Sequence, residues 1–126
     1  LFIIISWSMV KYSETEYDIF SRLFILKEFS EENIKKLSEI NIGIVGVGGI
    51  GCPLSHYLIS SGIKKIMLVD GDTVEKNNLN RQILYNIKNL GQKKVKVAKE
   101  KLELINKKCE INILDTEIDS KNVNLL

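Results

Sequence analysis

The stretch Gly46-Val47-Gly48-Gly49-Ile50-Gly51 is a G-x-G-x-x-G turn, and it decides the fold of this chain. It follows an apolar, β-branched run over 42–45 that predicts a buried strand. Pro53 and apolar positions at helical spacing then predict a helix that ends near Gly62. Strand, glycine-rich turn and helix in this order are typical of a Rossmann unit, in which the turn approaches a nucleotide phosphate.

A second apolar run over 65–70 closes this unit and ends in an acid, Asp70, which lies 19 residues beyond Gly51. Rossmann units place a carboxylate about 20 residues beyond the turn, so Asp70 is predicted to accept hydrogen bonds from ribose hydroxyls. In the same scheme Gly46 permits the tight turn, Gly48 lets the nucleotide approach the backbone, and Gly51 lets the helix pack close to the strand. The phosphate is then expected at the helix N-terminus, where free N–H groups favour negative charge.

The rest of the chain continues the alternation of strand and helix. A polar loop over 71–82, with one helical turn over 78–82, precedes a predicted helix over 91–105 and a third strand over 110–114. Such alternation predicts an α/β fold, a Rossmann-like parallel sheet with helices on both faces. The 126 residues are fewer than the ~150 usual for a doubly wound domain, so we expect one domain that is apparently truncated.

The segment ahead of the first strand carries weaker signals. Ser30 is predicted to cap a short amphipathic helix, whereas the polar residues 12–18 are expected to have no rigid structure of their own. Residues 1–10 are apolar but too few to span a bilayer, and they fit an extra edge strand. Because the sequence begins with Leu1, we interpret Met9 as the translation start.

Composition and charge exclude several classes of function. Hydrophobic residues make up 44% of the chain, and the net charge of +2 gives no field that attracts nucleic acid or a membrane. Cys52 and Cys109 form no C-x-x-C pair, so no zinc site or disulfide framework is expected here, and a reducing cytoplasm is the simplest location. His56 is interpreted as an ordinary helix residue. Cys52 is interpreted as a packing residue, with a reactive thiol at the helix N-terminus as the alternative.

Cationic and amide side chains near the strand ends are the candidate phosphate ligands. The loop after the second strand begins beside the glycine-rich turn, so Asn78 and Arg81 are placed to reach phosphates or a reacting carbonyl, or else to cap a turn. Lys93 or Lys94 begins the following helix, where the dipole disfavours a cation that has no anionic partner, so either one is a candidate. Arg22 interrupts an apolar segment and lies either on a solvated face or beside an acid.

Taken together, the glycine-rich turn, Asp70-x-Asp72, the run Asn78-Leu79-Asn80-Arg81-Gln82 and Gly91-x-x-Lys94 resemble the adenylation domain of the MoeB/ThiF family, relatives of the ubiquitin-activating enzymes. The resemblance makes residues 20–126 the N-terminal part of such a domain and leaves 1–19 as a poorly defined extension. It implies a cytoplasmic homodimer that uses ATP to adenylate the C-terminal carboxylate of a ubiquitin-like protein or sulfur carrier ending in Gly-Gly, with release of pyrophosphate.

The family's site residues carry over position by position. The resemblance implies that the turn contacts the nucleotide and that Asp70 holds the ribose. It also implies that Asn78, Arg81 and Lys94 reach the phosphates. Asp72 matches a family acid, and Arg22 matches an arginine that enters the active site of the partner subunit. The implied catalytic residues are Arg81, Lys94 and Arg22, and the implied nucleotide-binding residues are Gly46, Gly48, Gly49, Gly51, Asp70, Asp72, Asn78, Arg81 and Lys94.

The chain also departs from the family pattern. The family's magnesium-holding aspartate would lie beyond residue 126, as would any C-x-x-C zinc pairs, so no metal ligand is assigned here. Leu23 stands where the family commonly has Gln. Two alternatives remain open, an NAD-dependent oxidoreductase built on the same Rossmann unit and a truncated, non-catalytic binding subunit. The tRNA-dehydrating relatives share the Asn-x-Asn-Arg-Gln motif, which leaves an RNA or small-molecule acyl acceptor open as well.

Overall fold

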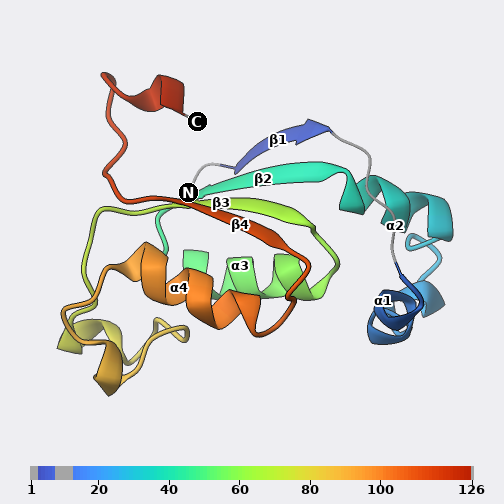
Figure 1. The fold of residues 1–126 in the computed structure, drawn as a ribbon, viewed down its shortest axis with the longest axis horizontal. Helices are drawn as coiled ribbons and strands as arrows, with labels where there is room; N and C mark the ends of the chain where they lie inside the picture. Colours follow the sequence, from blue (N-terminus) through green and yellow to red (C-terminus); the bar gives the residue numbers. More distant parts are fainter. Residues whose placement is uncertain (1–2, 8–12, 126) are drawn as a thin grey trace.

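The computed structural model describes residues 3–7 and 13–125 of the chain (Figure 1). Four strands form one sheet in the order β1-β2-β3-β4, with bounds Ile3–Trp7, Ile40–Val45, Lys65–Val69 and Glu110–Leu114. Strands β2, β3 and β4 run parallel, and β1 lies antiparallel along the outer edge of β2. The parallel sheet and the extra edge strand that the sequence predicts are therefore confirmed, while Met9 lies outside the described residues.

Two crossover helices connect the parallel strands. Helix α3 (Gly51–Ser60) joins β2 to β3, and α4 (Lys94–Glu103) lies between β3 and β4. Both helices pack on the same face of the sheet (Figure 1). Because β2, β3 and β4 follow one another in space as in sequence, successive crossovers of the same hand place their helices on one side. The Rossmann-like fold is as predicted, and the helices expected on the second face are not among the elements that the structure describes.

The core fills the space between this face and the two helices. Alternate residues of each strand point toward the helices, so the register brings Ile42, Ile66 and Ile111 side by side. All three are nearly fully buried, as are Val95, Ala98 and Leu102 on the facing side of α4. The pattern of apolar residues thus fixes which side of each strand and helix faces inward.

The N-terminal region lies at one end of the sheet, where β2 begins (Figure 1). Its helices are α1 (Glu14–Ile19), the 3-10 turn η1 (Leu23–Ile25) and α2 (Glu31–Ser38). Ser30 caps α2 as predicted, because its side chain accepts a hydrogen bond from the N–H of Asn33 at 3.3 Å. The expectation that 12–18 lacks rigid structure is wrong over α1. The Lys108 ammonium donates to the hydroxyl of Ser13 at 2.6 Å, a tertiary contact that ties down the start of this helix.

Three further 3-10 turns complete the fold: η2 (Lys76–Asn78), η3 (Ile87–Asn89) and η4 (Val123–Leu125). The turn expected over 78–82 therefore begins two residues earlier, at Lys76. The Asp119 carboxylate accepts hydrogen bonds from the backbone N–H groups of Lys121 and Asn122, in the turn that precedes η4. None of the helices in the described ranges is both long and apolar enough to cross a bilayer.

Candidate functional site at the carboxyl ends of the strands

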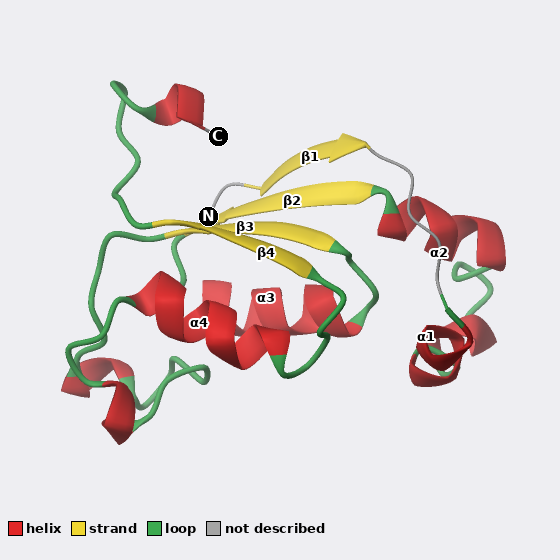
Figure 2. Cartoon of the chain, in the orientation of Figure 1, coloured by secondary structure: helices red, strands yellow, loops and turns green. Residues whose placement is uncertain are grey.

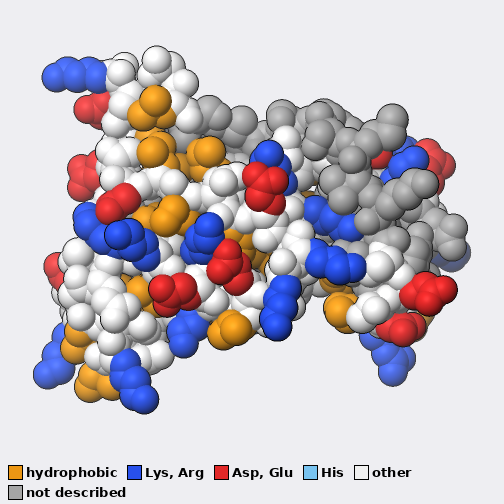
Figure 3. All heavy atoms as spheres, viewed as in Figure 1, with side chains coloured by type: hydrophobic (Ala, Val, Ile, Leu, Met, Phe, Trp, Pro, Cys, Tyr) orange, Lys and Arg blue, Asp and Glu red, His pale blue; other side chains and the backbone are white. Residues whose placement is uncertain are grey.

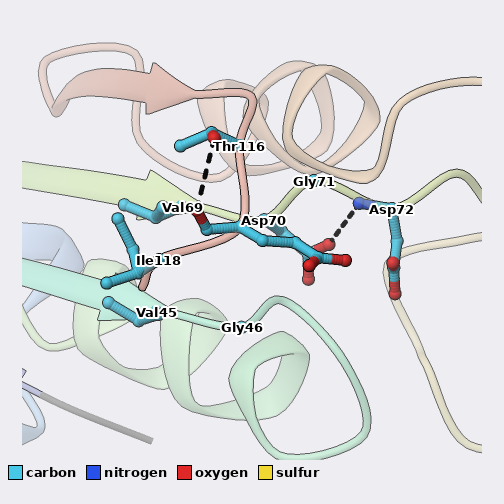
Figure 4. Close-up of a pocket in the computed structure, with 9 residues that line it drawn as sticks. Val45, Gly46, Val69, Asp70, Gly71, Asp72, Thr116 and Ile118 are labelled. Atoms are coloured by element: carbon cyan, nitrogen blue, oxygen red, sulfur yellow. Dashed lines mark hydrogen bonds between the residues drawn. The ribbon is translucent and has the colours of Figure 1, made fainter. Parts of the chain in front are cut away.

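Loops that leave β2, β3 and β4 meet at one end of the sheet (Figure 2). Two clefts open there and share the residues Val45 and Gly46. The larger, of about 520 Å³, is lined by the glycine-rich turn and by Arg81. The smaller, of about 340 Å³, is lined by Asp70, Asp72 and the segment 116–118 that follows β4 (Figure 4). Open α/β sheets bind their ligands at this end, so the clefts mark the candidate site.

The glycines of the turn have distinct roles in the structure. Gly46 adopts φ +92°, a left-handed conformation that strains any residue with a Cβ. Gly51 lies against the backbone, because a Cβ at this position would come within 1.9 Å of the Gly46 carbonyl oxygen. A Cβ at Gly48 or Gly49 would come no closer than 3.6 Å to any neighbour. The sequence thus predicts the tight turn and the close helix packing correctly, and a Cβ at Gly48 or Gly49 would meet only Gln82 or Arg81, at ordinary van der Waals distance.

Asp70 connects the two clefts. Its Oδ2 accepts a hydrogen bond from the N–H of Val47 at 2.7 Å, and its Oδ1 accepts one from the N–H of Asp72 at 2.9 Å (Figure 4). The carboxylate therefore shapes the glycine-rich turn as well as facing the smaller cleft. Each carboxylate oxygen keeps a further lone pair for a ligand hydroxyl, so these two bonds leave the predicted contact with ribose feasible.

Arg81 lies over the glycine-rich turn. Its side-chain carbons lie 3.6 Å from the position that a Cβ on Gly49 would take. One of its guanidinium nitrogens donates to the Asn77 carbonyl at 2.8 Å and to the Asn80 side chain at 3.0 Å. These bonds hold the cation at the wall of the larger cleft, where it faces the helix N-terminus that the sequence assigns to a phosphate.

Asn78 has its side chain engaged in the turn that precedes Arg81. Its Oδ1 accepts from the N–H of Glu75 at 3.0 Å, and its Nδ2 donates to the Asn77 side chain at 2.7 Å. Asn78 is 7% exposed, and its carbonyl accepts from the N–H groups of Arg81 and Gln82. The structure thus shows the capping role that the sequence left open. Through this turn Asn78 supports the position of Arg81, and a contact with phosphate stays a prediction.

Lys94 and Asp72 form a short ion pair. The ammonium lies 2.6 Å from the Asp72 carboxylate, with the Lys94 side chain 7% exposed and that of Asp72 58% exposed. The backbone N–H of Lys94 also donates to the Asp72 carbonyl at 3.0 Å. The resemblance counts Asp72 among the nucleotide-binding residues, and its contacts show that it holds the buried lysine at the start of α4.

Lys93 has a different set of partners. Its ammonium lies 2.9 Å from Asp115 and donates to the Gly71 carbonyl at 2.8 Å. It therefore joins the loop after β3 to the residue that follows β4. The sequence left the choice between Lys93 and Lys94 open, and both lysines meet an anion.

Arg22 lies far from these groups within the same chain. It is exposed and lies in sequence between α1 and α2, two helices found at the end of the sheet opposite the loops that follow β2, β3 and β4 (Figure 1). The length of the strands separates these helices from the clefts, so Arg22 is not placed to act in the site of its own chain (Figure 1). A role for Arg22 therefore requires the site of a second subunit, as the resemblance implies.

Sequence reasoning missed Tyr85, a buried residue that supports the glycine-rich turn from the side of the core. The Tyr85 hydroxyl donates to the Val47 carbonyl at 2.8 Å, and the Cys52 thiol lies 3.3 Å from the same oxygen. Burial raises the pKa of the Cys52 thiol, and its side chain is fully buried, so the reactive-thiol alternative is wrong. No signal in the sequence places Tyr85 here, because it lies 38 residues from Val47.

The described residues hold no group of three His, Cys, Asp or Glu side chains that could bind a metal ion. Magnesium, which the family resemblance implies, therefore lacks a ligand set in this part of the chain. Lys and Arg side chains are intermingled with Asp and Glu over the face shown in Figure 3. This mixture matches the small net charge of +2 and gives that face no single-sign patch for a polyanion.

Comparison with known proteins shows the family of the chain and finds relatives that are named as adenylyltransferases. The family model described as "ThiF family" matches residues 20–126. A probable molybdopterin-synthase adenylyltransferase from Porphyra purpurea is 40% identical over 111 residues, which is 88% of this chain and 29% of that protein. A sulfur carrier protein adenylyltransferase from Thermus thermophilus is 30% identical over 113 residues, or 90% of this chain and 42% of that protein.

Solved structures show the same relationship. The E. coli tRNA N6-threonylcarbamoyladenosine dehydratase TcdA in complex with ATP superimposes with a TM-score of 0.86 and 30% identity, covering 92% of this chain and 47% of TcdA. E. coli MccB, solved with AMPCPP and the MccA peptide, gives a TM-score of 0.81 at 31% identity, covering 90% of this chain and 34% of MccB. The chain thus spans less than half the length of each of these relatives.

Proposed function

The chain belongs to the ThiF family, and from this premise we propose that the protein adenylates the C-terminal carboxylate of a ubiquitin-like or sulfur-carrier protein at the expense of ATP. The observation that carries the proposal is the larger cleft, in which the Arg81 side chain covers a glycine-rich turn that begins α3. The proposal places ATP over Gly48 and Gly49, which line this cleft and have no side chain to stand between a phosphate and the backbone. Family membership also argues against the NAD-dependent oxidoreductase.

The chemistry that we propose requires little beyond positioning and charge. A carboxylate oxygen attacks the α-phosphorus of ATP, the bond from that phosphorus to the oxygen bridging the β-phosphate breaks, and pyrophosphate leaves with the bonding electrons. Negative charge accumulates on the phosphates during this step, and a fixed cation stabilises it. Arg81 supplies that cation at the wall of the larger cleft, and we propose that Lys94, the first residue of α4, supplies a second one through its pair with Asp72 at the smaller cleft. Asp70 orients the ribose.

ATP–pyrophosphate exchange tests this function. The full-length protein is assayed with candidate carrier proteins that end in Gly-Gly, and carrier-dependent exchange is expected. Arg81→Ala should reduce exchange about 100-fold or more, the usual effect of removing one transition-state donor. Lys88→Ala is the matched control, since it removes an exposed cation of the same loop that does not line the cleft. ATP binding without exchange for any carrier would instead favour the non-catalytic binding subunit.

We propose that Arg22 acts in the site of a second subunit of a homodimer. The helices α1 and α2, which flank Arg22 in sequence, lie at the end of the sheet opposite the clefts, and this placement motivates a complementation experiment (Figure 1). Arg22→Ala and Arg81→Ala are each expected to be inactive alone, whereas mixed dimers contain one site with both arginines intact. Recovery of exchange on mixing, approaching a quarter of the wild-type rate for random pairing, supports the role in trans. No recovery in dimers shown to have exchanged subunits would contradict it.

A second candidate function is activation of a carboxylate linked to RNA. The TcdA structures favour it, because a tRNA-modifying dehydratase superimposes on this chain with a TM-score of 0.86. The two functions differ in the acceptor and share the ATP site. The exchange assay separates them when tRNA carrying a carboxylate modification is added in place of the carrier protein. Stimulation by tRNA alone would replace the first proposal with this one.

A further inference from the structure

Val47, inside the glycine-rich turn, is held by side chains from three other parts of the chain. Its N–H donates to Asp70 Oδ2 at 2.7 Å. Its carbonyl accepts from the Tyr85 hydroxyl at 2.8 Å and from the Cys52 thiol at 3.3 Å. Val47 and Cys52 are fully buried, and Tyr85 is 6% exposed. The backbone is therefore fixed at this residue from both sides.

The direction of the Val47 carbonyl determines the direction of the next N–H. No described peptide bond is cis, and in a planar trans peptide the C=O of one residue and the N–H of the next point in opposite directions. The Val47 carbonyl faces the buried Tyr85 hydroxyl, so the Gly48 N–H faces away from the core, toward the cleft that Gly48 lines. Within the described ranges, no group accepts a hydrogen bond from this N–H.

We propose that Tyr85 is a positioning residue for the phosphate site: its hydroxyl fixes the Val47 carbonyl in the core and thereby aims the Gly48 N–H at a bound phosphate. The inference rests on the proposed function, because ATP provides that phosphate. Tyr85 itself touches only the protein. Without its hydroxyl, the Val47 carbonyl would keep only the thiol of Cys52, a weak donor, and the peptide that carries the Gly48 N–H would be free to rotate.

The Tyr85 hydroxyl keeps its role as a hydrogen-bond donor over the whole physiological pH range. Burial raises the pKa of Tyr85 well above its ordinary value, so its proton stays in place and the group remains a donor at every physiological pH. The bond also joins the turn to the segment that carries Arg81, only four residues before Tyr85. Two groups that face the same cleft, the Gly48 N–H and the Arg81 guanidinium, are thereby held in a fixed relation.

The test compares Tyr85→Phe with Tyr57→Phe, a matched control in which the hydroxyl removed belongs to a tyrosine on α3 that is 68% exposed. Affinities for ATP and for adenosine, which has no phosphate, are measured by calorimetry on the full-length protein. Tyr85→Phe is expected to bind ATP about tenfold more weakly, the worth of about one hydrogen bond, and adenosine as well as the wild type does. Tyr57→Phe is expected to change neither affinity.

A measurement on the wild-type protein keeps the test valid if Tyr85→Phe fails to fold. The amide resonance of Gly48 should shift on addition of ATP and should not shift with adenosine. Unchanged ATP affinity in Tyr85→Phe, or a Gly48 amide resonance that does not shift when ATP is added, would overturn the role of Tyr85. Neither result would contradict ATP binding by the protein. Equal losses for ATP and adenosine would reduce Tyr85 to a structural residue and also overturn it. A wild-type protein that binds no ATP would contradict the proposed function and this inference together.

Discussion

Gly51→Ala is expected to lower stability and Gly48→Ala to lower ATP affinity, although both replace a glycine of the same turn. At Gly51 the new Cβ would lie 1.9 Å from the Gly46 carbonyl oxygen, whereas real Cβ contacts are almost never shorter than 3.0 Å. The obstacle is backbone, so the turn and α3 must separate by about 1 Å. Overpacking of this kind costs about 1–3 kcal/mol. We expect a loss of about 3 kcal/mol, which lowers the melting temperature by roughly 10 °C.

At Gly48 the new Cβ would meet only the Gln82 side chain, at 3.8 Å. The free energy of unfolding should therefore change by no more than about 0.5 kcal/mol. The methyl group occupies the space that ATP is proposed to enter, so ATP affinity should fall about tenfold or more. Urea unfolding and calorimetric titration with ATP measure the two effects. The reasoning is refuted if Gly48→Ala destabilises the fold as much as Gly51→Ala does, or if Gly48→Ala binds ATP normally.

The remaining predictions concern an ion pair and the buried thiols. Asp72→Ala should lower the free energy of unfolding by about 3 kcal/mol, because it leaves the Lys94 ammonium, 7% exposed, without its partner. Lys94→Met removes the buried charge and should cost about 1 kcal/mol or less. Urea unfolding of both variants measures the two losses, and a larger loss for Lys94→Met would contradict this account of the ion pair. Burial raises the pKa of Cys109 from 9.0 to about 12. Because the folded pKa lies above the unfolded one, this contribution to stability is fully present below about pH 9 and is lost as the pH rises toward 12. Unfolding midpoints measured from pH 7 to 11 should fall above pH 9, less so in Cys109→Val. Cys52 and Cys109 should both resist a thiol reagent at pH 8 until the chain unfolds, and rapid reaction of either in the folded protein would contradict their burial.

Much of the nucleotide-binding unit could be predicted from local sequence. The bounds of β4, Glu110–Leu114, match the predicted strand, and the predicted second strand differs from β3 only in including Asp70. These elements follow from the spacing of apolar residues and from glycines at positions whose backbone conformation or close packing other residues do not tolerate. Local patterns predicted less at α1, which forms where no rigid structure was expected. The start of this helix is held by the hydrogen bond from Lys108 to Ser13, two residues that lie 95 positions apart in the sequence.

Tertiary structure decided the roles of the polar side chains. The motif contains Asn78, Arg81 and Lys94 as equal candidates, yet the fold engages Asn78 in a turn, places Arg81 on the cleft wall and pairs Lys94 with Asp72. The helices that flank Arg22 in sequence, α1 and α2, lie at the end of the sheet opposite the clefts (Figure 1). The roles of Asn78, Arg81 and Lys94 depend on where the long loop after β3 returns, which no local pattern records.

The sequence by itself determined a β-α-β unit with a glycine-rich turn and an acid at the end of the second strand, because periodicity and glycine positions act over a few residues. Only the tertiary structure decided that Tyr85 supports the turn from 38 residues away and that Lys94 meets Asp72 across 22. It also decided that α3 and α4 share one face of the sheet. The physical reason is that hydrogen bonds and ion pairs between distant segments exist only once the packed core has fixed the path of the backbone.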